Sequence, residues 1–280
     1  MELVALRTFK AVVEEGGVLA ASRRLNTVQS NVTTRIRRLE EELGATLFFR
    51  KGRGLELAPP GRVLLEFADR MLQLERQTAA AVRQVGAETG ELRIGSMETF
   101  AALHLPRGLM RLRELHPGVD LRVVTDTSEA LVDGVLAHRL DCAFVAGPLE
   151  DARLVCETVA EEELVCASVG GSSGLPLILF RAGCAYRARA IEWQRQLGQS
   201  ATQVMEMGTL EGILGCVGAG VGWTLLPRRV IEQSRHGGKV VLTPVPAALA
   251  RVPTLMVRHR DSPPLRAADS LAASVACGEP

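Results

Sequence analysis

The apolar residues in the N-terminal part of the chain recur at the three- and four-residue intervals of amphipathic helices. A stripe within residues 3–13 predicts a first helix, which ends at Gly16 and Gly17. A short helix over residues 18–25 and a longer one over residues 28–43 follow. Asn26 lies between them, where asparagine tolerates the backbone of a tight turn.

The helix expected over residues 28–43 has an apolar and a polar face. Its apolar residues keep the spacing of one buried stripe: Val28, Val32, Ile36, Leu39 and Leu43. The other face carries compact hydrogen-bonding groups and guanidinium groups: Gln29, Ser30, Thr33, Thr34, Arg37 and Arg38. A helix that enters the major groove of DNA needs such groups near its N-terminus, with positive charge close to phosphate.

Residues 47–57 alternate in the manner of a hairpin, with glycines at the turn. We expect a wing whose cations lie against phosphates or reach the minor groove: Arg50, Lys51 and Arg53. A long helix follows, predicted to link and dimerise the protein over residues 59–90 and to end near Gly86 to Gly90. Its apolar residues follow a heptad repeat, with a seam formed by Leu64, Phe67, Met71 and Leu74.

From Glu91 onward, apolar runs of strand length alternate with helical segments. Residues 92–146 predict a β-α-β-α-β order with one helix over residues 98–115, and residues 164–275 predict a second group of alternating elements. The β-α-β-α-β order favours an open sheet with mostly parallel strands. Two such lobes would enclose a cleft, and ligands of open α/β sheets bind beyond the carboxyl ends of the strands.

Charge is distributed unevenly along the chain. Residues 18–53 hold eight Lys or Arg and three acids, a local net charge of +5, and the three acids are consecutive at the far end of the 28–43 helix. Residues 1–90 carry 14 basic and 11 acidic side chains, so +3, whereas residues 91–280 carry 19 and 21, so −2. The positive charge therefore lies in the part proposed to touch DNA.

Residues 16–50 contain a dense signature whose spacing has no gaps. It consists of Ala21-Ser22-Arg23-Arg24-Leu25, Gln29-Ser30, Ile36, Leu39-Glu40, Leu43-Gly44, Leu47-Phe48 and Arg50. This stretch resembles the LysR-type transcriptional regulators, although Val28 and Thr34 depart from the family's usual residues. The later lobes are similar to the effector domain of the same family, so the resemblance covers nearly the whole chain.

The resemblance implies an α+β multidomain protein with three parts. These are a winged helix-turn-helix over residues 1–58, a linker and dimerisation helix over residues 59–90, and a two-lobed α/β effector domain over residues 91–280 that resembles periplasmic binding proteins. Lobe one would span residues 91–161 and 266–280, and lobe two residues 162–265. The implied partners are double-stranded DNA with an interrupted palindromic operator, a small-molecule co-inducer, a second copy in a dimer of dimers, and RNA polymerase.

Candidate effector-binding residues stand at the ends of the predicted strands, where hydroxyls and helix N-termini can hold a small anion. They are Ser96, Met97, Thr99, Thr127, Ser128, Gly147, Cys184, Tyr186, Gly208 and Thr209. The alternative for the hydroxyl residues is that each only caps its own helix. Ser96 and Thr127 are the two whose loss we expect to remove the effector response.

Other features exclude some classes of protein. The N-terminus contains acids and no long apolar core, and no apolar run reaches membrane-spanning length, so we expect a cytoplasmic protein. The six cysteines form no C-x-x-C pair and the five histidines no ligand spacing, so neither a cofactor nor a metal is expected; Cys184 is the weak candidate for redox sensing. A small-molecule binding protein with an accessory N-terminal domain remains the alternative, and an enzyme is a third, lacking an assembled nucleophile and base.

Overall fold

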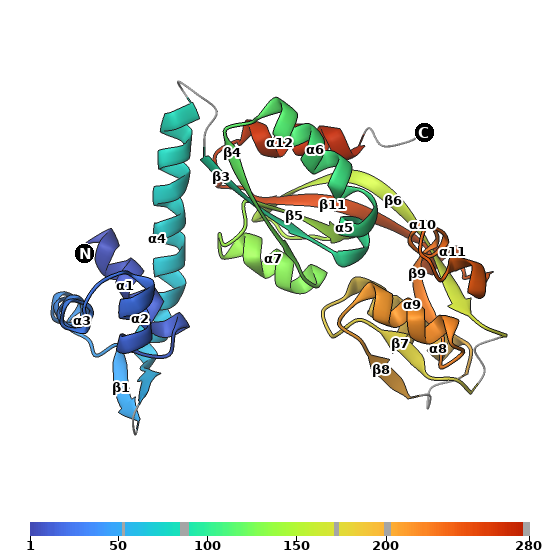
Figure 1. Ribbon diagram of the computed structural model, residues 1–280, viewed down its shortest axis with the longest axis horizontal. Helices are drawn as coiled ribbons and strands as arrows, with labels where there is room; N and C mark the ends of the chain where they lie inside the picture. The colour runs from blue at the N-terminus through green and yellow to red at the C-terminus, as the bar shows by residue number, and fades with distance from the viewer. Residues whose placement is uncertain (52–53, 85–89, 171–173, 199–202, 277–280) are drawn as a thin grey trace. The chain divides into compact units, whose positions relative to one another are not determined.

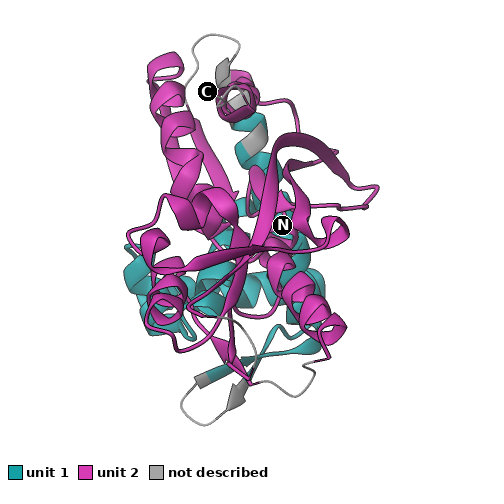
Figure 2. Ribbon diagram, turned by 90° about the vertical axis from the view of Figure 1, so that its right-hand side faces the viewer, with its two compact units in different colours: residues 1–79 teal, residues 80–280 magenta. Residues whose placement is uncertain are grey.

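The structure is a computed structural model that describes residues 1–51, 54–84, 90–170, 174–198 and 203–276. It divides into two compact units, residues 1–79 and 80–280, which Figure 2 shows in different colours. Figure 1 labels the helices and strands. Each unit is described by itself.

The first unit is a helix-turn-helix followed by a hairpin and a long helix (Figure 1). Its elements are α1 (Leu3–Glu14), α2 (Val18–Arg24), α3 (Gln29–Leu43), β1 (Phe48–Lys51), β2 (Gly54–Leu57) and α4 (Pro59–Gln84), of which the last continues beyond the unit. Strands β1 and β2 pair antiparallel. The predicted linker end at residues 86–89 and the wing residue Arg53 lie outside the described residues.

Two residues with positive φ shape the ends of the helices around the motif. Asn26 has a φ of 50° in the turn between α2 and α3, which confirms the turn expected there. Gly44 ends α3 with a φ of 62°, a conformation that glycine adopts without steric cost. The helix therefore stops where the hairpin has to begin.

The buried face of α3 is shorter than predicted. Val32, Ile36 and Leu39 are buried as expected, but Val28 is 60% exposed and Leu43 is 41% exposed, so the prediction for these two end residues is wrong. Val28 precedes the helix with an extended backbone at the N-cap position, and its side chain therefore does not continue the helical stripe. Leu43 lies in the last turn of the helix, beyond the contact with the neighbouring helices.

Helix α4 packs on its own unit along one side. Leu64, Ala68 and Leu72 are buried in the same apolar core as Leu6 and Phe9 of α1. Ion pairs between Arg7 and Glu75 and between Lys10 and Asp69 also join α1 to α4. The opposite side of α4 keeps its apolar residues exposed.

The second unit contains two lobes. Lobe one consists of β3 (Gly90–Ser96), α5 (Glu98–Leu103), α6 (Leu105–Leu115), β4 (Val119–Thr125), α7 (Ser128–Leu136), β5 (Cys142–Ala146) and α12 (Arg266–Ala276). Lobe two consists of β7 (Leu177–Leu179), α8 (Ala185–Gln196), β8 (Val204–Glu206), α9 (Leu210–Gly218), β9 (Thr224–Pro227), α10 (Arg228–Glu232), the 3-10 turn η1 (Gly237–Lys239), β10 (Val241–Pro244) and α11 (Ala247–Ala250).

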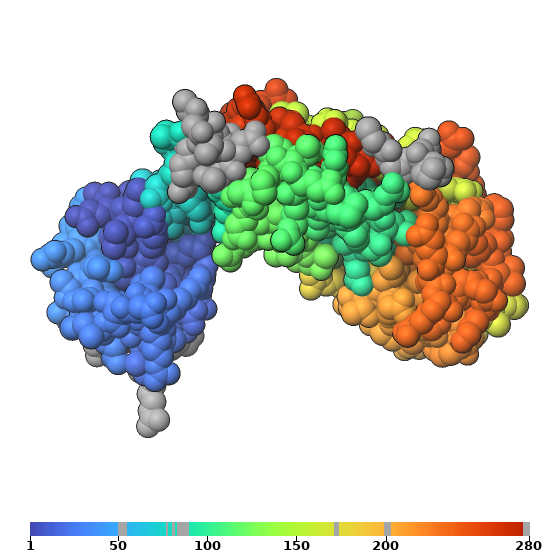
Figure 3. Space-filling view, turned by 45° about the horizontal axis from the view of Figure 1, so that its top comes forward, coloured from blue at the N-terminus to red at the C-terminus, as the bar shows by residue number. Residues whose placement is uncertain are grey.

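Two long strands, β6 (Leu154–Ser168) and β11 (Arg251–His259), join the lobes. The first part of β6 pairs with β11, and its last residues pair with β9 and β10 of lobe two. The main sheet has the order β10-β6-β11-β5-β3-β4, with β9 also on β6. In the space-filling view of Figure 3, the green surface of lobe one meets the orange surface of lobe two directly.

The expectation of mostly parallel strands is confirmed for residues 92–146, whereas the main sheet as a whole is mixed. Strand β3 lies parallel to β4 and β5, and β7 parallel to β8, but β11 runs antiparallel to β5 and β6. The reason is topological, because β6 leaves lobe one for lobe two and β11 returns. A strand that leaves and a strand that returns through the same junction pair in opposite directions.

The single helix expected over residues 98–115 is two helices. The break falls at His104, because Pro106 lies in the first turn of α6 and proline donates no backbone hydrogen bond to the preceding turn. The interruption leaves α5 as a short helix whose N-terminus follows directly on β3. Residues 97–99 are thereby held at the junction between strand and helix.

Candidate functional site

The polar face of α3 is open to solvent. Gln29, Ser30, Thr34, Arg37 and Arg38 are exposed, whereas Thr33 is half-buried. The Thr33 hydroxyl donates a hydrogen bond to the carbonyl oxygen of Gln29 at 3.0 Å, so its proton is engaged within the helix. The exposed groups nearest the N-terminus of α3 are thus Val28, Gln29 and Ser30, and sequence reasoning missed the first because its spacing suggested burial.

The cations of this unit differ in how strongly they are paired. Arg24 makes ion pairs with Glu14 at 2.6 Å and with Glu15 at 3.1 Å, and these carboxylates raise the pKa of its guanidinium. Within the described residues, Arg37 and Arg38 make no ion pair. Their charge is therefore available to a partner, whereas that of Arg24 is neutralised. The side chains of Arg50 and Lys51 lie outside the described parts, as does Arg53.

The exposed side of α4 carries an apolar stripe, which we call the α4 stripe. Its members are Val63, Phe67, Met71 and Leu74, and their exposed fractions range from 37% for Met71 to 62% for Leu74. Leu64, which the sequence places in the seam, is only 8% exposed and belongs to the core of its own unit. The residue at the corresponding place in the stripe is Val63, one position earlier.

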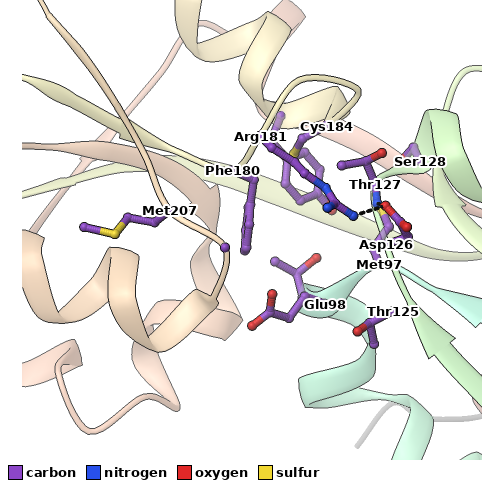
Figure 4. Close-up of a pocket in the computed structure, with 13 residues that line it drawn as sticks. Met97, Glu98, Thr125, Asp126, Thr127, Ser128, Phe180, Arg181, Cys184 and Met207 are labelled. Carbon is purple, nitrogen blue, oxygen red and sulfur yellow. Dashed lines mark hydrogen bonds and ion pairs between the residues drawn. The ribbon is translucent and has the colours of Figure 1, made fainter. Parts of the chain in front are cut away.

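Between the two lobes of the second unit lies a pocket of about 140 Å³ (Figure 4). The predicted effector-binding residues that line it are Met97, Thr99, Thr127, Ser128, Cys184, Tyr186 and Gly208. The lining residues that were not among those candidates are Glu98, Thr125, Asp126, Phe180, Arg181 and Met207. Five of these six are charged or apolar, and Thr125 is the one hydroxyl residue among them.

Three predicted residues do not line the pocket. Ser96 is fully buried, and its hydroxyl donates to the Met97 carbonyl oxygen at 3.0 Å. Gly147 is buried where β5 ends, and its carbonyl accepts a hydrogen bond from Arg189 at 3.3 Å. Thr209 accepts a hydrogen bond from the Gly212 backbone N–H at 3.1 Å and so caps α9.

Helix caps and pocket contacts coincide at one residue. The Thr127 side chain accepts a hydrogen bond from the Ala130 backbone N–H at 3.4 Å, which caps α7, and Thr127 also lines the pocket. The neighbouring Ser128 accepts a hydrogen bond from the Ala146 backbone N–H at 3.2 Å. The Ser128 hydroxyl thus holds the start of α7 against β5, and the N-terminus of α7 is presented to the pocket.

Charged contacts join the lobes across the pocket. Arg181 of lobe two donates to the Asp126 carboxylate of lobe one at 2.5 Å, as the dashed line in Figure 4 shows. Burial alone would raise the pKa of Asp126, but the Thr127 backbone N–H and the Arg181 guanidinium together lower it. Asp126 is therefore ionised at neutral pH. Glu98 of lobe one also accepts a hydrogen bond at 2.6 Å, from the backbone N–H of Leu210 at the start of α9.

Two less polar members of the lining are held in their neutral forms. Burial raises the pKa of the Tyr186 hydroxyl, which is hydrogen-bonded to Thr99. Burial also raises the pKa of the Cys184 thiol, although the backbone N–H groups of Arg187 and Tyr186 oppose this effect. Because the thiolate is the reactive form, the position of Cys184 does not favour the redox-sensing role considered from the sequence.

The part of the chain that the structure describes contains no group of three or more His, Cys, Asp or Glu residues placed to hold a metal ion. Within the same part, no helix combines the length and apolar character needed to cross a bilayer. One unit therefore presents a helix whose exposed polar face carries Arg37 and Arg38, and the other contains a small pocket with both charged and apolar walls.

A helix-turn-helix with a free polar face, followed by a two-lobed domain with a pocket, defines a DNA-binding transcriptional regulator with a ligand-sensing domain. Residues 3–62 match the family model described as bacterial regulatory helix-turn-helix protein, lysR family, and residues 86–277 match the LysR substrate binding domain. The chain belongs to the LysR family of transcriptional regulators.

Relatives and solved structures agree with this assignment. The chain is 36% identical over 271 residues to the HTH-type transcriptional regulator GltR of Bacillus subtilis, covering 94% of this chain and 92% of that protein. It is 36% identical over 268 residues to the regulator SoxR of an Arthrobacter species, covering 94% and 92%. Full-length CbnR complexed with its target DNA has the same fold, with a TM-score of 0.71, 21% identity and coverage of 98% and 99% of the two chains.

Proposed function

We propose that this regulator reads its operator with the N-terminal part of α3 and changes its activity when a small molecule occupies the pocket between the lobes. The exposure of Gln29 and Ser30 at the start of α3 is the observation that supports operator reading by this helix. A glutamine side chain can make a bidentate contact with adenine in the major groove. The adjacent Val28 offers an apolar surface of the kind that contacts a thymine methyl group.

Phosphate contacts would come from the unpaired cations. Arg37 and Arg38 lie on the exposed face of α3 and make no ion pair within the described residues. The wing cations Arg50, Lys51 and Arg53 add to them in this proposal, as the sequence suggests. Such contacts set affinity and register without reading sequence.

Dimerisation through the α4 stripe would place two recognition helices on one operator. Phe67, Met71 and Leu74 are exposed in a single chain and follow heptad spacing, so a second copy of α4 could bury them. Dimeric helix-turn-helix proteins bind half-sites about 34 Å apart, which accounts for the interrupted palindrome expected here. The proposal extends to a dimer of dimers that acts on RNA polymerase, as the family resemblance implies, and to the cytoplasmic location expected from the sequence.

The effector part of the proposal rests on the pocket lining. Thr127 and Ser128 bring hydroxyls to the start of α7, while Phe180 and Met207 supply apolar surface from lobe two. A ligand that touches both walls bridges the lobes and stabilises their closed arrangement. Ser96, Gly147 and Thr209 support this lining from outside it.

The test of the DNA-reading role begins with mapping of the regulator on its genome, which supplies the operator. Gln29→Ala should weaken operator binding by about 1–3 kcal/mol and leave binding to random DNA nearly unchanged. Arg37→Ala should weaken both and reduce the salt dependence by about one unit of slope. Gln196→Ala, an exposed helical glutamine of α8, is the matched control and should change neither.

Fluorescence anisotropy with labelled operator and scrambled duplexes over a range of salt concentrations measures these effects. If Gln29→Ala weakens binding to both duplexes equally, the base-reading role is wrong and Gln29 acts only on the backbone of the DNA.

A further inference from the structure

The side chains that line the pocket do not balance in charge. Two carboxylates, Glu98 and Asp126, face one guanidinium, that of Arg181, so the lining carries one net negative charge. Arg181 donates to Asp126 at 2.5 Å, and these two charges neutralise each other. The negative charge of Glu98 is therefore the one without a cationic counterpart.

Glu98 is held in place without being neutralised. Its Oε1 accepts a hydrogen bond from the Leu210 backbone N–H at 2.6 Å, and the N-terminus of a helix favours an ionised carboxylate. Within the described residues, the other carboxylate oxygen of Glu98 makes no hydrogen bond or ion pair. The side chain is half-buried, so an unmatched charge here is less well solvated than on the open surface.

The groups around Glu98 suit a small amphipathic ligand. Figure 4 shows Glu98 below Phe180, with Met207 to the left of both, and Arg181 reaching from beside Phe180 to Asp126 on the right. An anionic ligand placed beside Glu98 would lack a free cation, because Arg181 is already bonded to Asp126. A cationic group would supply the missing counter-charge, while the apolar walls accept a hydrocarbon part.

We propose that the effector of this pocket carries a protonated primary amine, which binds the free oxygen of Glu98, and an apolar chain, which packs against Phe180 and Met207. This inference rests on the proposed effector role of the pocket and adds the chemical class of the ligand. Both simple alkylamines and amino acids with apolar side chains have this chemistry. The two differ in the carboxylate, which only the amino acids carry. The hydroxyls of Thr127 and Ser128 could donate hydrogen bonds to that carboxylate at the start of α7.

Matched trios of probes test the proposal on the full-length protein. Each trio contains an amino acid, the same molecule without its amine and the same molecule without its carboxylate, for example norleucine, hexanoate and pentylamine. Trios with hydrocarbon chains of two to six carbons cover the size of the pocket. Binding is measured by calorimetry and by the shift in melting temperature at pH 7.5.

The expected result is that at least one amine-bearing probe binds and its amine-free partner does not. Glu98→Gln should then weaken that probe about 10- to 100-fold, the usual range for losing a charged hydrogen-bond partner. The glutamine keeps an oxygen that can accept the Leu210 N–H. The matched control is Glu211→Gln, which neutralises an acid in the first turn of α9, next to Leu210 and outside the lining, and should leave affinity unchanged within about twofold.

Three results overturn the proposal: binding of the carboxylates alone, amine binding that Glu98→Gln does not weaken, or no binding of any probe. A reporter driven by the operator in its bacterial host then separates this failure from failure of the proposed function. Gly208→Phe should fill the pocket, because a Cβ at Gly208 meets no atom within 4 Å. If Gly208→Phe abolishes the response, the pocket is the effector site and only the amine class of the effector is wrong. An unchanged response shows that the pocket itself is not the effector site.

Discussion

Leu74 on the α4 stripe offers a test of assembly whose magnitude follows from the structure. Complete burial of a leucine side chain contributes about 1.5–3 kcal/mol. Leu74 is 62% exposed, so burial against a partner would add about 1–2 kcal/mol per copy. In a two-fold symmetric dimer the same contact occurs twice, which gives about 2–4 kcal/mol. Leu74→Ala should therefore raise the dimer dissociation constant roughly 30- to 700-fold.

Leu64→Ala is the matched comparison, because it removes the same atoms from the same helix on its buried side. Leu64 is 8% exposed within its own unit, so its truncation should lower the free energy of unfolding by about 2–5 kcal/mol. Sedimentation velocity over a dilution series gives the dissociation constant, and thermal melts give the stability. A dissociation constant for Leu74→Ala within about threefold of wild type would show that the α4 stripe is not the dimer interface.

Two further predictions concern packing and titration in the second unit. Gly222→Ala should cost about 1–3 kcal/mol in chemical denaturation, because its Cβ would lie 2.4 Å from the Pro176 carbonyl oxygen, whereas Gly208→Ala should cost little. Burial raises the pKa of the Cys142 and Cys166 thiols to about 12, so labelling with iodoacetamide at pH 8 should modify exposed Cys156 and spare these two. The native state keeps these thiol protons to a higher pH than the unfolded chain, so their contribution to stability is complete below pH 9 and is lost as pH rises towards 12.

Local sequence signals were sufficient for much of the fold. Asn26 and Gly44 mark the turn and the helix end because few residues adopt positive φ without strain, and both do so here. Strands β4 and β5 lie within residues 92–146, where the alternation of apolar runs and helical segments predicts strands. The errors arose where local pattern and chain topology disagree. Val28 has the spacing of a buried residue but precedes its helix. The direction of β11 was not predicted, because it depends on a crossing between lobes that no local pattern encodes.

The pocket was predictable in position more than in chemistry. The rule that ligands bind beyond strand ends predicts a site at Thr127 and Ser128, and both residues line the pocket. The charged contacts were missed because their partners are far apart in sequence. Asp126 meets Arg181 from another lobe, and Glu98 meets the backbone of Leu210, 112 residues later. Every residue except proline has a backbone N–H, so the sequence does not show which N–H donates to a distant carboxylate.

These inter-lobe contacts also constrain how an effector can act. A ligand shifts an equilibrium between arrangements only to the extent that its affinity differs between them. Asp126–Arg181 and Glu98–Leu210 join the lobes, so a ligand that displaced Glu98 from Leu210 would favour separation. A ligand that takes only the second oxygen of Glu98 and packs on Phe180 keeps this contact and adds one across the lobes. An amine is itself a hydrogen-bond donor, so it does not compete with Glu98 for the Leu210 N–H of α9. It can therefore bind the second oxygen of Glu98 while the Glu98–Leu210 contact stays in place, and its binding should favour the closed arrangement.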